Sequence, residues 1–482
     1  MSDLTKMTQT TSSPLEQDSA PRTQPHATDT PLRFRADGTF RVLQMADVQD
    51  GPDVSADAID LIEAAVSAAR PDLVVLTGDQ IRGYDPAYIE TFLRRRGERP
   101  GDHTRFVTRA EAIVQGIARP GRRERSDDEA IAEALDRSRG KVRETMAQFL
   151  GPIINMDVPF AATYGNHDFQ CGVDVDEQDD MYREFAGCLN PLPGSGPFAC
   201  ETGTFALPVR SSDGSHVAMN VALVNSGDYA PTVGGASDAT GFDEHDEYRH
   251  FSLADSDGYG MPSPRAVRWL GEMQERFTRE QGAPVPSIVF QHIPTPDYYQ
   301  CLRPVSPFTP NAVEGFRRFA GQCYVLDESK ARPGSRLGES IACSDDDSGE
   351  VSMMRRAGGY FALFTGHDHK NSFVSHIDGI DLGYAPTCGF TAYGPKSRLR
   401  GLRLFEFRED NPADYETHML TYGDLVGERS RNELRVFFGD HLVTSGETLR
   451  DELRKPGTFA TLAAGLAAIV HLAAVRREKR RR

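Results

Sequence analysis

The sequence predicts an α/β fold, and three neighbouring segments near its start carry that prediction. Residues 39–47 (TFRVLQMAD) are a short apolar run, residues 56–72 have helical spacing of apolar positions, and residues 72–79 (DLVVLTGD) are a continuous aliphatic run. A strand without polar alternation is typical of a parallel sheet covered on both faces. A strand, a helix and a strand with short links indicate a βαβ unit with a right-handed crossover.

The helix expected over residues 56–72 has one apolar face. Ser55 precedes it and is placed to cap its first turn. The apolar positions that recur at helical spacing are Ile59, Ile62, Val66 and Ala69.

The alternation of helices and strands continues along the chain. Residues 204–229 read as a hairpin around Asp213-Gly214. Ser263-Pro264 opens a helix whose apolar face is expected to hold Val267, Leu270, Met273 and Phe277. The other expected elements are an amphipathic helix over 141–153 and strands within 158–168, 287–292, 360–366, 371–384 and 402–409.

We divide the chain into three parts by composition. Residues 1–32 are rich in Ser, Thr, Pro and Gln and are expected to be a disordered tail. Residues 33–425 form the main domain, with a charge-dense, exposed, helical or disordered insertion over 94–140. Residues 426–482 form a C-terminal extension with an apolar helix and a basic tail.

The apolar stretch of that extension, residues 459–475, is uncharged and is followed by RREKRRR. A membrane-spanning helix needs about 20 apolar residues, and this Ala-rich stretch is shorter. We therefore expect no transmembrane span. A helix docked on the body or on a partner is favoured, and peripheral contact with an anionic membrane surface comes second.

Composition narrows the class of protein. The formal net charge of −17 argues against general nucleic-acid binding, because phosphate contacts need Lys and Arg. The seven cysteines are scattered without a CxxC pair, which predicts reduced thiols. Because the first residues also lack the apolar core of a signal peptide, we expect a cytoplasmic protein.

Five apolar strands end on residues that can bind metals or transfer protons. Functional residues of an α/β sheet gather at the carboxyl ends of its strands. The five groups are Asp47-Val48-Gln49, Gly78-Asp79, Gly165-Asn166-His167-Asp168, His292 and Gly366-His367-Asp368-His369. Each group alone is commonly a turn, a cap or a loop, whereas all five in one chain predict a shared site.

The residue types in these groups suit divalent metals. Carboxylate, imidazole and amide oxygen donors match Mn, Fe, Zn or Mg, and the absence of a thiolate argues against a structural zinc site. In an extended chain His367 and His369 point to the same side, so they can serve two neighbouring ions. A pair of ions about 3.5–4 Å apart is suited to clamping a phosphoryl group.

The motifs DxQ, GD, GNHD, His292 and GHDH, in this order, resemble the calcineurin-like metallophosphoesterase superfamily. The resemblance is strongest to the cytosolic branch related to purple acid phosphatases, and it runs from Asp47 to His369. It implies a four-layer α/β/β/α sandwich with a dimetal centre between the sheets. Residues 33–425 would then be the metallophosphoesterase catalytic domain.

The resemblance also implies roles for individual residues. The metal ligands by position are Asp47, Gln49 and His369 for the first ion, Asn166, His292 and His367 for the second, and Asp79 as the bridge. A metal-bridging hydroxide would attack a phosphate ester, a monoester rather than a diester, and His167 would act as general acid. The cofactors would be two divalent ions among Mn, Fe and Zn, with Mn or Fe favoured by the oxygen donor of Gln49.

Two departures from the family pattern leave an alternative open. The family usually has histidine where this chain has Gln49, and no ligand tyrosine follows Asp79. Gln49 favours a catalytically weak scaffold or regulatory protein that keeps the fold, although the other motif residues are present. The substrate is not fixed by the motifs; the candidates for lining its pocket are Tyr229, Tyr259, Lys370, Asn371 and Tyr393.

Overall fold

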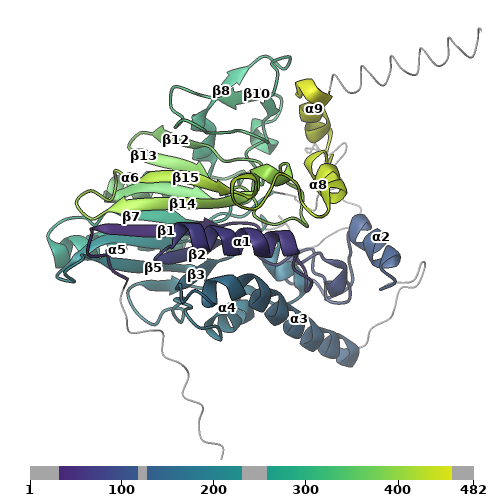
Figure 1. The fold of residues 1–482 in the computed structure, drawn as a ribbon, viewed down its shortest axis with the longest axis horizontal. Helices are drawn as coiled ribbons and strands as arrows, with labels where there is room; N and C mark the ends of the chain where they lie inside the picture. Colours follow the sequence, from purple (N-terminus) through teal and green to yellow (C-terminus); the bar gives the residue numbers. More distant parts are fainter. Residues whose placement is uncertain (1–31, 118–127, 231–257, 444, 459–482) are drawn as a thin grey trace, which may run out of the picture.

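The computed structural model describes residues 32–117, 128–230, 258–443 and 445–458, and within them two large β-sheets form the centre of the molecule (Figure 1). The five-stranded sheet has the order β15 (Glu416–Thr421), β14 (Gly401–Arg408), β1 (Thr39–Met45), β2 (Leu73–Thr77) and β3 (Phe160–Thr163). The seven-stranded sheet has the order β12 (Val374–Ile377), β13 (Ile380–Tyr384), β11 (Tyr360–Thr365), β7 (Ser287–Phe290), β6 (Val217–Leu223), β5 (Thr204–Arg210) and β4 (Ala199–Glu201). The predicted α/β class is confirmed.

Parallel strands occupy the middle of both sheets. In the first sheet β1, β2 and β3 are parallel neighbours, as the βαβ pattern predicted. In the second sheet β6, β7, β11 and β13 are parallel neighbours. Because parallel strands end at the same edge, the residues after β1, β2 and β3 lie together, and so do the residues after β7 and β11.

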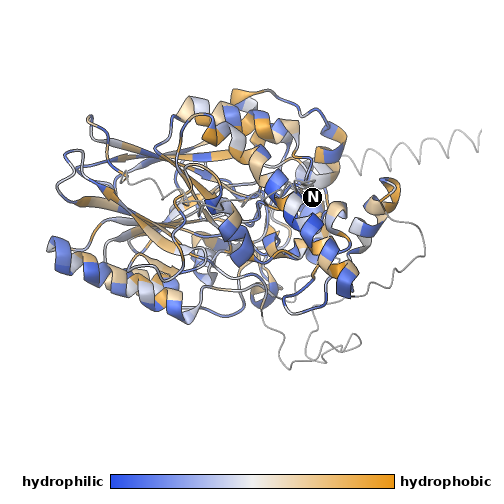
Figure 2. Ribbon diagram, turned by 90° about the horizontal axis from the view of Figure 1, so that it is seen from below, coloured by the Kyte–Doolittle hydropathy of each residue, from blue (hydrophilic) through white to orange (hydrophobic). Residues whose placement is uncertain are grey.

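Three apolar clusters hold the layers together. One lies between the first sheet and the helices α1 (Ala56–Ala69) and α3 (Asp128–Ile154), and another between the second sheet and α5 (Pro264–Gln281) and α6 (Glu350–Ala357). The third joins the two sheets, with Val42 and Val75 from one and Phe290 and Phe364 from the other. Figure 2 shows hydrophobic residues along the central strands and mixed colours along the surrounding helices.

The sequence predicted that the insertion ends near residue 140 and that an amphipathic helix begins at residue 141. In the structure, the helix α3 begins earlier, at Asp128. It is one helix of 27 residues, because Ile131, Ala134 and Ser138 continue the buried stripe that leads to Val142. Charged residues occupy the exposed positions between them, so the apolar periodicity of this part of α3 was not recognised in the sequence. Part of the predicted insertion, residues 118–127, lies outside the described residues.

Ser55 does not cap α1 as predicted. It occupies the position before the helix, but its side chain makes no cap hydrogen bond, and its backbone N–H donates to Asp50 Oδ2 at 2.8 Å. The predicted cap of α5 is confirmed, since Ser263 Oγ accepts from the backbone N–H of Ala266 at 3.0 Å. The predicted hairpin is formed by β5 and β6.

Several elements lie in segments for which no sequence pattern predicted a helix or strand. A small sheet has the order β8 (Leu302–Val305), β10 (Cys323–Leu326) and β9 (Val313–Glu314). The other helices are α2 (Phe106–Val114), α4 (Val175–Arg183), α7 (Tyr422–Leu425), α8 (Glu433–Asp440) and α9 (Gly446–Arg454). Short 3₁₀ helices span Pro86–Tyr88, Asp168–Cys171, Pro296–Cys301, Arg317–Phe319 and Ser397–Leu399.

The structure bears on two further predictions, the reduced cysteines and the absence of a transmembrane span. All seven cysteines are buried and free, as predicted. The expected tail up to residue 31 and the apolar stretch 459–475 lie outside the described residues. Among the described helices, none has the length and apolar character to cross a membrane.

Candidate metal centre

The five predicted groups follow five strands that end close together. Asp47 and Gln49 follow β1, Asp79 follows β2 and Asn166 follows β3, while His292 follows β7 and His367 follows β11. The first three strands belong to one sheet and the last two to the other. Contacts between His292 and Asp79, and between His369 and Asp47, join the two groups across the sheets.

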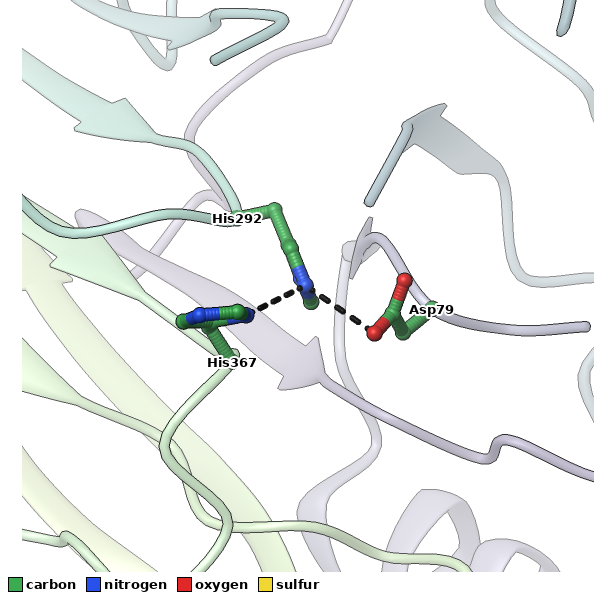
Figure 3. A group of neighbouring side chains, drawn as sticks. All are labelled: Asp79, His292 and His367. Carbon is green, nitrogen blue, oxygen red and sulfur yellow. Dashed lines mark hydrogen bonds and ion pairs between the residues drawn. The ribbon is translucent and has the colours of Figure 1, made fainter. Parts of the chain in front are cut away.

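One part of the site is centred on His292 (Figure 3). Its Nε2 atom lies 3.2 Å from Asp79 Oδ2 and 3.2 Å from His367 Nδ1. The same atom lies 3.3 Å from Asn166 Oδ1. Donor atoms that share one ion at about 2.1 Å are roughly 3.0–3.4 Å apart. The other three donor atoms thus lie at ligand spacing from His292 Nε2, and the ligand atoms of Asp79, His292 and His367 all lie within 4.8 Å of one another.

A second part of the site joins Asp47 to His369. Their Oδ1 and Nε2 atoms are 3.3 Å apart. His369 Nδ1 lies 2.6 Å from the Tyr393 carbonyl oxygen, and the two rings stack with centroids 4.1 Å apart. An Nδ1–H that donates to this carbonyl fixes the tautomer and leaves the Nε2 lone pair directed at Asp47.

Asp79 connects the two parts. Its Oδ2 atom accepts a hydrogen bond from Gln49 Nε2 at 3.2 Å and also faces His292. Its Oδ1 atom accepts from the backbone N–H of His167 at 2.7 Å. The carboxylate thus lies between the residues predicted for the first ion and those predicted for the second.

The polar atoms of the site fit bound cations. Gln49 Oε1 is fully buried and makes no hydrogen bond among the described residues. A buried acceptor without a partner is costly and uncommon in native proteins. Asp47 Oδ1 is also buried and lies 3.3 Å from the His369 imidazole, and a divalent ion would satisfy both oxygen atoms.

The backbone at the site is held in an uncommon conformation. Nine residues other than glycine have positive φ in the described chain, and four of them are predicted ligands. These four are Asp47 (φ 53°), Gln49 (φ 41°), Asp79 (φ 49°) and His367 (φ 71°). Such strain costs about 1–3 kcal/mol per residue and concentrates at functional sites.

The motif glycines leave room for the carboxylates. A Cβ atom on Gly165 would lie 2.2 Å from Asp79 Oδ1, and one on Gly366 would lie 2.7 Å from Asp47 Oδ2. Either substitution would displace a predicted ligand. The GNHD and GHDH motifs therefore need glycine for close approach as much as they need their histidines.

Sequence reasoning gave Asp168 no role, yet it holds two motifs together. Its carboxylate accepts from the backbone N–H groups of Asp79, Gln80 and Ile81, at 2.9 Å each, and from Gly165 at 2.7 Å. The loop after β2 is thereby fixed to the loop after β3. Only its position in the GNHD motif could have indicated this role in the sequence, because any acidic residue can accept hydrogen bonds from backbone N–H groups.

The charges of the site are strongly coupled. Burial opposes ionisation of His292, but the Asp79 carboxylate outweighs it and raises the His292 pKa to about 9. Burial likewise favours neutral Asp79, but His292 and His167 hold the pKa of its carboxyl below the usual range. Without a metal, a proton on His292 thus partly neutralises Asp79 where a cation would otherwise do so.

His167 is positioned beside this pair. Its Nδ1 atom lies 2.7 Å from Gln170 Oε1, which fixes a proton on Nδ1. Burial is the main reason that the pKa of His167 falls to about 4, against the attraction of Asp79. The imidazole is therefore neutral near pH 7 in the metal-free protein.

Aromatic rings surround the histidines. Tyr229 Oη accepts from Asn166 Nδ2 at 3.0 Å and lies 3.4 Å from His167 Nδ1. The Tyr259 ring contacts the His367 ring edge-on, with centroids 4.3 Å apart. Both tyrosines lie at the site, as expected of pocket candidates.

Two other pocket candidates are directed elsewhere. Lys370 Nζ donates to the Asp440 carbonyl at 2.5 Å, and Asn371 Oδ1 accepts from the backbone N–H of Gly338 at 2.8 Å. The expectation that Lys370 and Asn371 line the pocket was wrong, because both side chains join neighbouring loops.

The predicted insertion contributes two arginines that sequence reasoning missed. The Arg105 guanidinium lies 4.2 Å from the centroid of the Tyr84 ring, which is itself 4.9 Å from His167. The Arg95 guanidinium lies 4.5 Å from the centroid of the Tyr229 ring. Aromatic stacking keeps both positive charges near the histidines, and no motif marked them in advance.

The comparisons with known proteins cover most of the chain. It is 21% identical over 398 residues to an Arabidopsis thaliana protein named "Probable inactive purple acid phosphatase 14", covering 78% of this chain and 77% of the relative. It is 24% identical over 409 residues to "Probable inactive purple acid phosphatase 28" of the same plant, with 78% and 77% covered. No family model matches the chain.

Among solved structures, a dimetal phosphatase from Danio rerio is similar with a TM-score of 0.38 and 14% identity. The similarity covers 80% of this chain and 99% of that structure.

Proposed function

We propose that the chain is a dimetal-dependent phosphoesterase, because it is similar in sequence to proteins named as probable inactive purple acid phosphatases and because metal-binding residue types gather at one site. The proposed substrate is a phosphate ester, with monoesters preferred over diesters. One observation carries the proposal: Asp79 Oδ2 contacts Gln49 on one side and His292 on the other. A carboxylate in this position can be shared by two ions.

We assign the ligands from the geometry and the resemblance together. The proposed set is Asp47, Gln49 and His369 for the first ion, Asn166, His292 and His367 for the second, and Asp79 shared. Two divalent ions, with Mn or Fe preferred over Zn, would polarise the phosphoryl oxygens and lower the pKa of a water. The amide of Gln49 would have to turn so that Oε1, which has no hydrogen bond here, replaces Nε2 beside Asp79.

His167 is the proposed general acid. Its backbone N–H donates to Asp79 Oδ1, so the residue is held next to the shared carboxylate. Gln170 holds Nδ1, and the proton to be transferred would therefore be carried by Nε2. Since burial keeps the pKa of His167 low, that proton would be acquired when a dianionic phosphate ester binds and raises the pKa.

Arg95 and Arg105 are proposed to recognise the substrate. Their guanidinium groups stack on Tyr229 and Tyr84, the rings nearest to His167. A guanidinium forms strong charge-assisted hydrogen bonds with phosphate oxygens. Two positive charges at the rim favour a monoester dianion over a diester monoanion.

A second candidate is a catalytically weak scaffold or regulatory protein. Two observations favour it: Gln49 stands where histidine is usual, and the relatives are named as inactive. Under this alternative the site would bind metal weakly and release no phosphate.

The decisive experiment is alcohol or phenol release with Mn²⁺ from a panel of alkyl and aryl monoesters and matched diesters, because a hydrolysed diester releases an alcohol but no inorganic phosphate. The phosphoesterase proposal expects turnover of monoesters that disappears in His292→Ala. His376→Ala is the control, because His376 is an exposed histidine paired with Asp381. Hydrolysis that is equal in both variants would come from a contaminant, and hydrolysis of no ester would favour the scaffold.

A further inference from the structure

Exposed apolar side chains concentrate at the end of the described chain. Thirteen large hydrophobic residues are exposed in the described part of the molecule, and seven of them lie between residues 426 and 453. We call these seven the C-terminal apolar surface: Val426, Leu434, Phe437, Phe438, Leu442, Leu449 and Leu453. Such a concentration is typical of a surface that binds a partner or a membrane.

The surface follows helical geometry. On α8, Leu434, Phe437 and Phe438 are three and four residues apart and so lie on one face. The two phenylalanine side chains are 57% and 64% exposed. On α9, Leu449 and Leu453 are four residues apart. Figure 1 shows α8 and α9 together at one corner of the molecule.

Polar contacts hold the two helices in place. Arg435 Nε donates to the Thr391 carbonyl at 3.2 Å, and His441 Nδ1 lies 3.0 Å from Glu452 Oε2. Val436 is buried, in contrast to its neighbours Phe437 and Phe438. The helices are thus attached through other positions, and the apolar residues remain on the outside.

The sequence that follows α9 adds two matching features. Residues 459–475 carry no acidic or basic side chain except His471. Residues 476–482 (RREKRRR) contain six basic residues and one acidic residue, whereas the whole chain has a net charge of −17. In the sequence, an apolar stretch and then a basic segment therefore follow the C-terminal apolar surface.

We propose that the C-terminal apolar surface binds the surface of an anionic lipid membrane, to which the six basic residues of the sequence 476–482 are complementary in charge. Interfacial binding uses apolar side chains at the acyl boundary and basic residues at the headgroups, and one signal alone binds weakly. A second copy of the chain, or residues 459–475 folded back, would explain the apolar residues but not the basic heptapeptide. The acidic body would be repelled from anionic lipid, which makes a local basic segment necessary.

Co-sedimentation of the full chain with vesicles tests the proposal. We expect binding to phosphatidylcholine vesicles that contain phosphatidylserine, weak binding to pure phosphatidylcholine, and a decrease with salt. The double variant Phe437→Ser, Phe438→Ser should bind at least about tenfold more weakly. Leu192→Ser is the matched control, since Leu192 has the same exposed fraction as Phe437, 57%, and lies outside the surface.

A second variant tests the charges separately. Replacing the six basic residues of 476–482 with glutamine should weaken binding by roughly fivefold for each charge that contacts anionic lipid. Unchanged melting temperatures would show that both variants fold.

Three results would overturn the proposal. The first is absence of binding to phosphatidylserine vesicles. The second is binding that Phe437→Ser, Phe438→Ser and Leu192→Ser reduce equally. The third is a concentration-dependent dimer that the double variant abolishes while vesicle binding is unchanged, which would assign the surface to a second copy.

Discussion

His367 Nδ1 lies 3.2 Å from His292 Nε2, and that nitrogen is in turn 3.2 Å from Asp79 Oδ2. Burial and the neighbouring His292 lower the pKa of His367 well below its usual value. Only His292 of the two histidines therefore carries a proton easily. A divalent ion in place of that proton would contact all three groups at once.

This arrangement predicts that Mn²⁺ stabilises the folded protein. Ligand at one hundred times its Kd adds about 2.7 kcal/mol to the free energy of unfolding. The melting temperature of the chelator-treated protein should therefore rise on adding Mn²⁺, and the rise should be smaller in His292→Ala, which removes a ligand of the proposed second ion. Thermal scans of both proteins, with the exposed-site variant His376→Ala as control, measure this. An equal rise in His292→Ala and His376→Ala would place the second ion elsewhere.

His167→Ala should lose activity and keep its bound metal. General acid catalysis contributes roughly 10²–10⁴-fold, so hydrolysis of alkyl phosphates should decrease by this factor. Hydrolysis of nitrophenyl phosphate should change little, because nitrophenolate leaves without a proton. Initial rates with the two esters, alongside metal analysis, give the comparison. Equal losses with both would show that His167 acts in binding or positioning.

Gln49→His should tighten the first metal site and shift its preference toward Zn²⁺. A glutamine offers one neutral oxygen, whereas imidazole suits Zn and other later transition metals. Metal titrations of the two proteins, each with Mn²⁺ and Zn²⁺, separate the effects. Identical affinities would mean that Gln49 only donates a hydrogen bond to Asp79, the contact that the structure shows.

Arg105→Gln should raise KM for monoesters and change kcat less. A charge-assisted hydrogen bond contributes about 1.5–3 kcal/mol, which corresponds to an effect of roughly tenfold or more. Steady-state kinetics should show no such change in Arg137→Gln, because Arg137 pairs with Glu90 on the exposed face of α3. A fall in kcat without a change in KM would argue against a role in substrate binding.

The positions of the main strands along the chain and the residues at their ends could be predicted from sequence. A continuous aliphatic run such as 73–77 predicts a strand because all its side chains must be buried. A residue that can bind a metal, here Asp79, follows such a run within a few positions. The distances between His292, Asp79 and His367 could not be predicted, because they depend on how two sheets face each other. The left-handed backbone at Asp47 and Gln49 was also not predictable, since neither residue requires that conformation.

The residues around the predicted metal ligands could not be predicted as well from the sequence. Arg105 reaches the site through stacking on Tyr84, and no short motif encodes a contact between residues 21 positions apart. Lys370 follows a metal-binding motif directly, yet its long side chain turns to Asp440. Side chains next to a motif in sequence are therefore poor guides to the pocket.

The most direct test of a shared dimetal centre is the metal content and phosphate release of Asp79→Asn after reconstitution with Mn²⁺. A neutral amide cannot balance two dications, so the account predicts fewer than two ions per chain and loss of turnover with a monoester. The melting temperature of the chelator-treated variant shows whether it folds. Two bound ions with turnover equal to that of the unmodified protein would contradict the account.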